Sequence, residues 1–225
     1  MANDREKEAA ARASLAFIED GQVVGLGSGS TASYFIQLLG ERVKNGLRIL
    51  GIPTSRRSQE LAESLGIPLT TLNECQEIAV TVDGADEVDP ELRLIKGGGG
   101  ALLREKVVAS ATRRLVIVTD ASKQVERLGK FPLPVEVIRF AQALVAKRIA
   151  AMGADVRLRT NADGTPYLTD ESNHILDCRF GEIQNADALA RALSDMPGVV
   201  EHGLFIGMAS VVVVARGNEV VELRR

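Results

Sequence analysis

Short apolar runs alternate with amphipathic segments through the first half of the chain, and this alternation predicts a parallel α/β fold. A first helix is expected to run to Asp20, where Gly21 supplies a left-handed stop. The expected strands are 23–26, 47–52, 78–82, 92–95 and 115–119, and the expected helices are 31–44, 57–65 and 101–113. Strands that alternate with helices in this way form a doubly wound, mostly parallel, Rossmann-like sheet.

The pattern changes at Phe131-Pro132-Leu133-Pro134, because two prolines cannot continue a helix and are typical of a linker or an edge strand. The segments that follow are expected to form strands at 135–138, 156–159 and 175–179 and helices at 141–152 and 186–195. This order is typical of a small antiparallel sheet with helices. We therefore expect a main α/β catalytic domain made of residues 1–132 and 203–225, and a smaller α+β domain made of residues 133–202.

Composition narrows the class of protein. The chain has 225 residues, of which 45% are hydrophobic, so it can bury a sizeable core. Its 27 basic and 30 acidic residues are scattered and give a net charge of −3, which argues against a nucleic-acid or membrane partner. Cys75 and Cys178 have neither the spacing nor the histidine neighbours of a disulfide framework or zinc site. With no signal-peptide pattern at the N-terminus, we expect a cytoplasmic protein.

Four polar loops each follow directly on a predicted strand. They are Gly25–Thr31, Asp83–Glu87, Lys96–Gly100 and Asp120–Lys123. Ligands of open parallel sheets bind at the carboxyl ends of the strands. We therefore expect the four loops to converge on one crevice.

The first loop has the features of a phosphate site. Its glycines let backbone N–H groups approach an anion, and the hydroxyls of Ser30 and Thr31 stand at a helix N-terminus. Ser30 replaces the third glycine of a dinucleotide fingerprint, and no Gly-Lys-Ser/Thr of a P-loop follows. The alternative is an ordinary strand-to-helix turn in which Ser30 or Thr31 caps the helix.

The second loop places Asp83 and Asp86 on either side of Gly84, so that both carboxylates can point into the crevice. Two solvated turn residues would have the same sequence, because tight turns favour Asp and Gly. A magnesium site is a further alternative, whereas the lack of a supporting histidine makes zinc or iron improbable.

The third loop combines a cation with a run of glycines. Lys96 and the N–H groups that follow it suit an oxyanion better than a packed core. Glu105 shares a stripe of small residues with Ala101 and Ala109, and this stripe should face the core or the crevice. Glu105 could equally be a first-turn carboxylate favoured by the helix dipole. His174 and His202 lie outside all four loops, so the plausible chemistry is proton transfer by carboxylates and lysine on a phosphorylated metabolite.

Taken together, these motifs resemble type A ribose-5-phosphate isomerase. The resemblance is carried by Gly27–Ala32, Val82–Glu87, Ile95–Ala101 through Arg104–Lys106, Asp120–Lys123, Gly129–Val137 and Pro197–Phe205. The segments match in order and spacing and cover nearly the whole chain. Ser28 stands where many relatives have threonine, and Arg139 stands where proline is common. Neither departure touches the proposed proton chemistry.

The resemblance implies a cofactor-free and metal-free isomerisation of ribose 5-phosphate and ribulose 5-phosphate by a homodimer or homotetramer. It makes Glu105 the base of a cis-enediolate mechanism, with Asp83, Asp86 and Lys96 serving the sugar oxygens. The implied substrate contacts are Lys7, Ser28, Gly29, Ser30, Thr31, Gly84, Ala85, Gly97, Gly98, Gly99 and Lys123.

Three other functions compete with this interpretation. A sugar-phosphate sensor would need a DNA-binding module, and only one helix precedes the first strand. An amino-sugar phosphate deaminase would be expected to use a histidine for ring opening. An acyl-CoA transferase would use Glu105 as a nucleophile.

Overall fold

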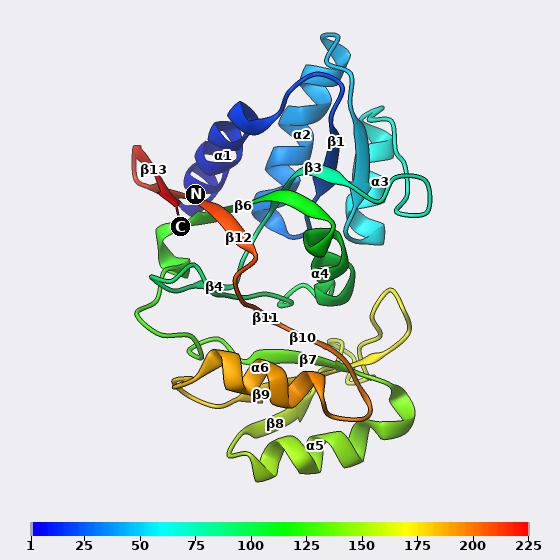
Figure 1. The fold of residues 1–225 in the computed structure, drawn as a ribbon, viewed down its shortest axis with the longest axis vertical. Helices are drawn as coiled ribbons and strands as arrows, with labels where there is room; N and C mark the ends of the chain where they lie inside the picture. Colours follow the sequence, from blue (N-terminus) through cyan, green and yellow to red (C-terminus); the bar gives the residue numbers. More distant parts are fainter. Residues whose placement is uncertain (1, 225) are drawn as a thin grey trace. The chain divides into compact units, whose positions relative to one another are not determined.

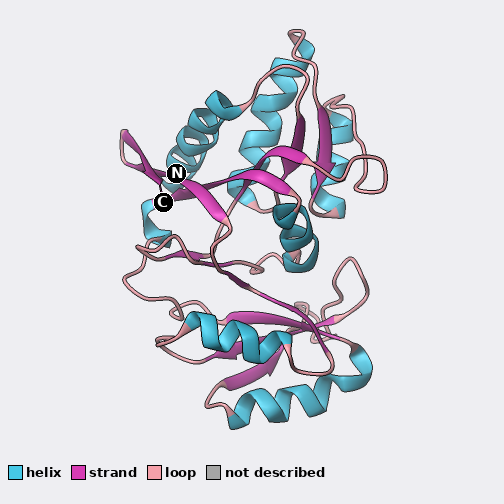
Figure 2. Ribbon diagram, in the orientation of Figure 1, coloured by secondary structure: helices cyan, strands magenta, loops and turns pink. Residues whose placement is uncertain are grey.

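The computed structural model describes residues 2–224, which separate into two compact units. The first unit contains the chain through Ala85, the segment Arg104–Gln124 and the segment from Gly207 onward. The second unit contains Asp86–Leu103 and Val125–Ile206. Both units mix helices with strands (Figure 2). The division into a domain of residues 1–132 and 203–225 and a domain of residues 133–202 stays a prediction.

The first unit is built on a six-stranded sheet with the order β13-β12-β6-β3-β1-β2. The strands are β1 (Val23–Leu26), β2 (Leu50–Pro53), β3 (Ile78–Asp83), β6 (Thr112–Asp120), β12 (Ala209–Arg216) and β13 (Glu219–Arg224). Every neighbouring pair is parallel except β12 and β13, which form an antiparallel hairpin. The predicted doubly wound, mostly parallel sheet is therefore confirmed, but the strand expected at 92–95 was wrongly assigned to it, because Leu94 and Ile95 pair antiparallel with other strands of the second unit.

Helices cover both faces of this sheet. They are α1 (Ala2–Ser14), α2 (Ser30–Lys44), α3 (Arg56–Ser64) and α4 (Leu102–Ser110) (Figure 1). The main core joins α1 and α2 to alternate strand residues such as Val24 and Leu26. Ile52 is in register with Gly25 and so points to the other face, where it packs with Val108 of α4.

Two helices end more than one residue earlier than predicted. Helix α1 stops at Ser14 and continues as a 3₁₀ turn, η1 (Leu15–Phe17), before Gly21 takes the expected left-handed conformation at φ +80°. Helix α4 stops at Ser110, because Thr112 already pairs with Ile78 of β3. Sheet pairing therefore overrides the helical pattern predicted to continue to residue 113.

The second unit contains two antiparallel sheets. The larger has the order β10-β7-β9-β8 and the smaller has the order β11-β5-β4. Their strands are β4 (Glu87–Val88), β5 (Leu94–Ile95), β7 (Leu133–Val137), β8 (Asp155–Leu158), β9 (His174–Arg179), β10 (Val199–His202) and β11 (Leu204–Phe205). Helices α5 (Gln142–Ala151) and α6 (Ala186–Ser194) bury Val145 and Leu193 against the larger sheet. The predicted small antiparallel sheet is present.

The expectation of an edge strand at the prolines was wrong, because β7 lies between β10 and β9. Pro134 is the second residue of β7, and its carbonyl accepts the N–H of Gly203 at 2.8 Å, just beyond the end of β10. A strand residue directs its N–H and C=O to the same side. The missing N–H of Pro134 therefore faces the end of β10 and costs the ladder with β9 nothing.

Between residues 2 and 224, no helix combines the length and the apolar character needed to cross a membrane.

Candidate active site

The first predicted loop joins β1 to α2. Gly29 is the residue before the helix, with φ +92°, and no side chain caps the N-terminus of α2. Ser30 and Thr31 therefore stand in the first turn, and the alternative in which one of them is an ordinary cap was wrong. The first-turn N–H groups of a helix lack intrahelical acceptors, and the helix dipole favours an anion beside them.

Asp83 ties the end of β3 to this loop. Its carboxyl group is buried, with the residue only 1% exposed, and Oδ1 accepts the N–H of Ser28 at 3.0 Å and of Gly84 at 2.7 Å. A Cβ atom on Gly27 would lie 2.4 Å from the same Oδ1, so glycine is required for this approach. Asp83 is thus a buried organiser of the loop and not the solvated turn residue of the alternative interpretation.

The hydroxyl of Ser28 enters a small polar network of the first unit. It lies 2.8 Å from Thr54 Oγ1 and 2.7 Å from Ser55 Oγ, and Ser55 caps α3. Neither Thr54 nor Ser55 belongs to the four loops predicted from the sequence. They directly follow β2, which ends at Pro53, one residue beyond the strand predicted at 47–52, so the rule that found the other loops also points to them.

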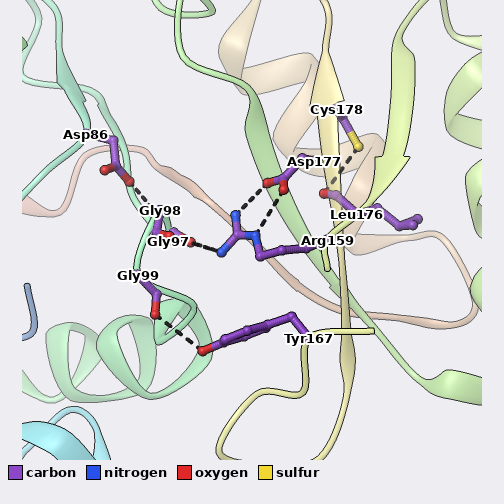
Figure 3. Close-up of polar contacts among 9 residues, drawn as sticks. All are labelled: Asp86, Gly97, Gly98, Gly99, Arg159, Tyr167, Leu176, Asp177 and Cys178. Carbon is purple, nitrogen blue, oxygen red and sulfur yellow. Dashed lines mark hydrogen bonds and ion pairs between the residues drawn. The ribbon is translucent and has the colours of Figure 1, made fainter. Parts of the chain in front are cut away.

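Asp86 belongs to the second unit, where it holds the glycine run. Its Oδ2 accepts the N–H of Gly98 at 2.7 Å (Figure 3). Both aspartates therefore use a carboxylate oxygen to fix backbone N–H groups, Asp83 in the first unit and Asp86 in the second. The expectation that all four loops share one crevice stays a prediction.

Three of the four glycines have local structural reasons. Gly97 and Gly100 have φ values of +102° and +83°, which side chains disfavour. A Cβ on Gly98 would lie 2.5 Å from Asp86 Oδ1. A Cβ on Gly99 would meet no atom within 4 Å, so packing does not require glycine there.

Lys96 is buried in the second unit although it carries a charge. The residue is 3% exposed, its N–H donates to Gly203 O at 2.9 Å, and its Nζ lies 5.4 Å from the ring centroid of Phe205. A cation over an aromatic face is attracted by the ring quadrupole. The ammonium group is therefore held in a largely dehydrated environment.

Glu105 stands in the first turn of α4, where it is 5% exposed. Ala109, one turn later, is buried as well, as the stripe of small residues predicts. The remaining cations of the prediction lie elsewhere in the first unit. Lys123 ends the 3₁₀ turn η2 (Ala121–Lys123) after β6, and Lys7 is half-buried in α1.

The histidines lie in the second unit, away from the predicted loops in the sequence. His202 is buried, and its Nε2 lies 3.1 Å from Ser194 Oγ. Burial lowers the pKa of His174, with a smaller contribution from Arg139. Both histidines lie in strands of the larger sheet, His174 in β9 and His202 in β10.

The first strand-to-helix turn of this Rossmann-like sheet offers amide groups to an anion. Buried carboxyl groups stand at the end of a strand and in the first turn of a helix. Together these features define a class of enzymes that act on phosphorylated metabolites. Comparisons with known proteins identify the member of this class. The family described as ribose 5-phosphate isomerase A (phosphoriboisomerase A) matches residues 50–219.

Curated relatives and solved structures agree with this match. Ribose-5-phosphate isomerase A of Parvibaculum lavamentivorans is 52% identical, over 98% of this chain and 99% of the relative. The enzyme of Roseiflexus castenholzii is 51% identical, over 95% and 93%. A D-ribose-5-phosphate isomerase solved in complex with phospho-erythronic acid is 40% identical, with a TM-score of 0.97 over 100% of both chains. The Methanocaldococcus jannaschii enzyme is 39% identical, with a TM-score of 0.95 over 99% of both chains.

The chain belongs to the ribose 5-phosphate isomerase A family. Its reaction is the aldose–ketose isomerisation of ribose 5-phosphate, the activity of that family. This finding decides against the sensor, deaminase and acyl-CoA transferase alternatives.

Proposed function

We propose that Glu105 is the base that carries a proton between C2 and C1 of the open-chain sugar, through a cis-enediolate. The observation that supports this role is the burial of Glu105 in the first turn of α4, where the residue is 5% exposed and its Oε2 is buried. A carboxylate deprived of hydration is a stronger base than one in water, and a positioned base contributes roughly 10²–10⁴-fold to proton transfer.

Lys96 and the N–H groups of the glycine run stabilise the oxyanion that develops as the proton leaves C2. The buried ammonium group supports this assignment, because charges act most strongly where water is excluded. Asp83 and Asp86 assist ring opening and move protons between the sugar hydroxyls. Their hydrogen bonds to backbone N–H groups fix the direction of each carboxylate.

The substrate phosphate binds at the first turn of α2, where uncapped N–H groups and hydroxyls are available. Anchoring the phosphate holds the reacting carbons against the base. The proposed contacts to the substrate are Ser28, Gly29, Ser30, Thr31, Gly84, Ala85, Gly97, Gly98, Gly99 and Lys123, with Lys7 as a further cation.

The reaction needs neither metal nor cofactor, since hydrogen moves between the two carbons as a proton and no external electron acceptor takes part. We place the enzyme in the cytoplasm as a homodimer or homotetramer, with no nucleic-acid or membrane partner. Phospho-erythronic acid, bound in the related structure, should also bind here, because its carboxylate carries the negative charge that the enediolate acquires.

The test is turnover of D-ribose 5-phosphate in the presence of EDTA by the wild type and by Glu105→Gln. We expect kcat to fall at least about 10³-fold in the variant while KM changes little, because only the base is removed. Glu60→Gln, an exposed glutamate of α3, is the matched control and should behave as the wild type. An unchanged kcat in Glu105→Gln, or a loss confined to KM, would contradict the assignment.

A further inference from the structure

Arg159 connects the larger sheet of the second unit to the glycine run of the same unit. It directly follows β8, and its Nη1 donates to the carbonyl oxygens of Gly97 at 2.9 Å and Gly98 at 3.1 Å (Figure 3). Gly97 and Gly98 precede Arg159 by 62 and 61 residues, so the contact exists only in the folded chain. One guanidinium group therefore holds two successive peptide carbonyls.

The guanidinium itself is held on its other side. Its Nε donates to Asp177 Oδ2 at 3.0 Å and its Nη2 to Asp177 Oδ1, a two-bond fork from the neighbouring strand β9. The side chains of this pair are only 14% and 26% exposed. The ring of Tyr167 lies 5.9 Å from Arg159 Cζ, and its hydroxyl approaches Gly99 O at 3.4 Å. Arg159 thus has little freedom to move.

Fixing a carbonyl also fixes the next N–H group, because the two point in opposite directions across a trans peptide. The bond to Gly97 O directs the N–H of Gly98 toward Asp86. The bond to Gly98 O directs the N–H of Gly99, which donates to no acceptor among residues 2–224. A cation bound to a carbonyl also polarises the peptide and makes its N–H a stronger donor.

We propose that Arg159 is a positioning residue for the isomerisation, which aims and polarises the N–H of Gly99 as a donor to the enediolate oxyanion. This inference rests on the proposed function, in which the glycine run receives that oxyanion. The open space at the Cα of Gly99, where an added Cβ would meet no atom within 4 Å, leaves room for the substrate. Asp177 and Tyr167 act through Arg159 by holding its guanidinium in place.

The first measurement compares kcat and KM for D-ribose 5-phosphate in the wild type, Arg159→Met and Arg159→Lys. Loss of a preorganised oxyanion donor lowers kcat by about 10²–10³-fold, so we expect a fall of roughly 10²-fold in Arg159→Met with KM within about threefold of the wild type. Lysine keeps the charge without the fork and should recover part of the rate. Arg157, two residues earlier in β8, has a side chain that is 75% exposed; Arg157→Met is the matched control and should keep full activity.

The second measurement compares two ligands in the same variants. Phospho-erythronic acid carries a negative charge where the oxyanion forms, whereas ribitol 5-phosphate has the same phosphate and a neutral hydroxyl at C1. We expect Arg159→Met to lose at least about tenfold in affinity for the acid and nothing for ribitol 5-phosphate. Should this variant fail to fold, the same ratio is measured on Arg159→Lys.

Equal losses of affinity for both ligands, or a kcat equal to that of Arg157→Met, would overturn the proposal. The first result would mean that Arg159 only maintains the fold, and the second that the glycine run needs no such support. A failure of the proposed function would look different. In that case Glu105→Gln would retain activity, whatever the behaviour of the Arg159 variants.

Discussion

Replacing Gly27 with alanine tests the close approach of β1 and β3 on which the loop between β1 and α2 depends. The N–H of Gly27 donates to Val82 O at 3.0 Å. An added Cβ would lie 2.5 Å from that oxygen, 2.5 Å from the Cα of Asp83 and 2.4 Å from Asp83 Oδ1. Two of these atoms belong to the backbone of β3, so a side-chain rotation cannot relieve the overlap.

The expected cost follows from these distances. Unstrained carbon contacts lie at about 3.5–4.0 Å, so β3 must move away by about 1 Å. Overpacking of this kind costs roughly 1–3 kcal/mol, and losing the bond from Ser28 to the carboxylate adds about 1.5 kcal/mol or more. Alanine also stiffens the unfolded chain, which returns about 0.4–1 kcal/mol. We therefore expect Gly27→Ala to lower the free energy of unfolding by about 3 kcal/mol.

Urea unfolding and steady-state kinetics together check this prediction. Gly84→Ala is the control for stability, because its Cβ would only touch Ser28 O at an ordinary 3.6 Å. Its free energy of unfolding should stay within about 0.5 kcal/mol of the wild type. In Gly27→Ala, kcat/KM should fall with stability, since the displaced Asp83 and Ser28 belong to the proposed site. A Gly27→Ala protein as stable and as active as the wild type would refute the reasoning.

Two further predictions concern buried carboxyl groups of the second unit. The pKa of Glu136 in β7 is raised, chiefly because burial disfavours its charged form. The folded state therefore holds a proton that the unfolded chain releases, and wild-type stability falls as the pH rises through the folded pKa, by at most about 1.4 kcal/mol per pH unit. Glu136→Gln should remove this loss, which is checked by measuring the urea midpoints of both proteins between pH 4 and pH 8. Midpoints that depend on pH in the same way in both proteins would contradict the prediction. Glu87 accepts the N–H of Gly129 through Oε2 at 2.7 Å and that of Phe131 through Oε1 at 2.5 Å. Glu87→Gln should therefore lower the free energy of unfolding, measured in urea at pH 7, by about 3 kcal/mol. A decrease below about 0.5 kcal/mol would mean that the amide group fits as well as the carboxylate.

The sequence predicted those parts of the fold that depend on local apolar pattern. The strand expected at 23–26 is β1 without any shift, because a short valine-rich run between polar turns has few alternatives. The end of α4 and the place of Pro134 were missed, because both depend on pairing with distant strands. Propensity cannot show which neighbour a strand will have.

The same distinction applies to the candidate site. The rule that ligands bind after parallel strands pointed to Ser28 and Asp83, which follow β1 and end β3. It also pointed to the glycine run, but that run follows β5, whose neighbours β4 and β11 are both antiparallel to it. It could not find Arg159, which lies 62 residues from Gly97 and reaches it only through the register of β8 with β9. Nor could it show that Gly97, Gly98 and Gly100 serve the loop's own geometry while Gly99 does not.

For Asp83 and Asp86, the property that holds the loops can be distinguished from the properties that the proposed chemistry requires. Oδ1 of Asp83 alone accepts the N–H groups of Ser28 and Gly84, and Oδ2 of Asp86 accepts that of Gly98. These bonds require an acceptor oxygen, which the amide of asparagine would also supply. What a carboxylate adds to such an oxygen is a negative charge and the ability to take up a proton. Those two properties are the ones that the roles proposed for the two aspartates, in ring opening and in proton transfer between hydroxyls, would require.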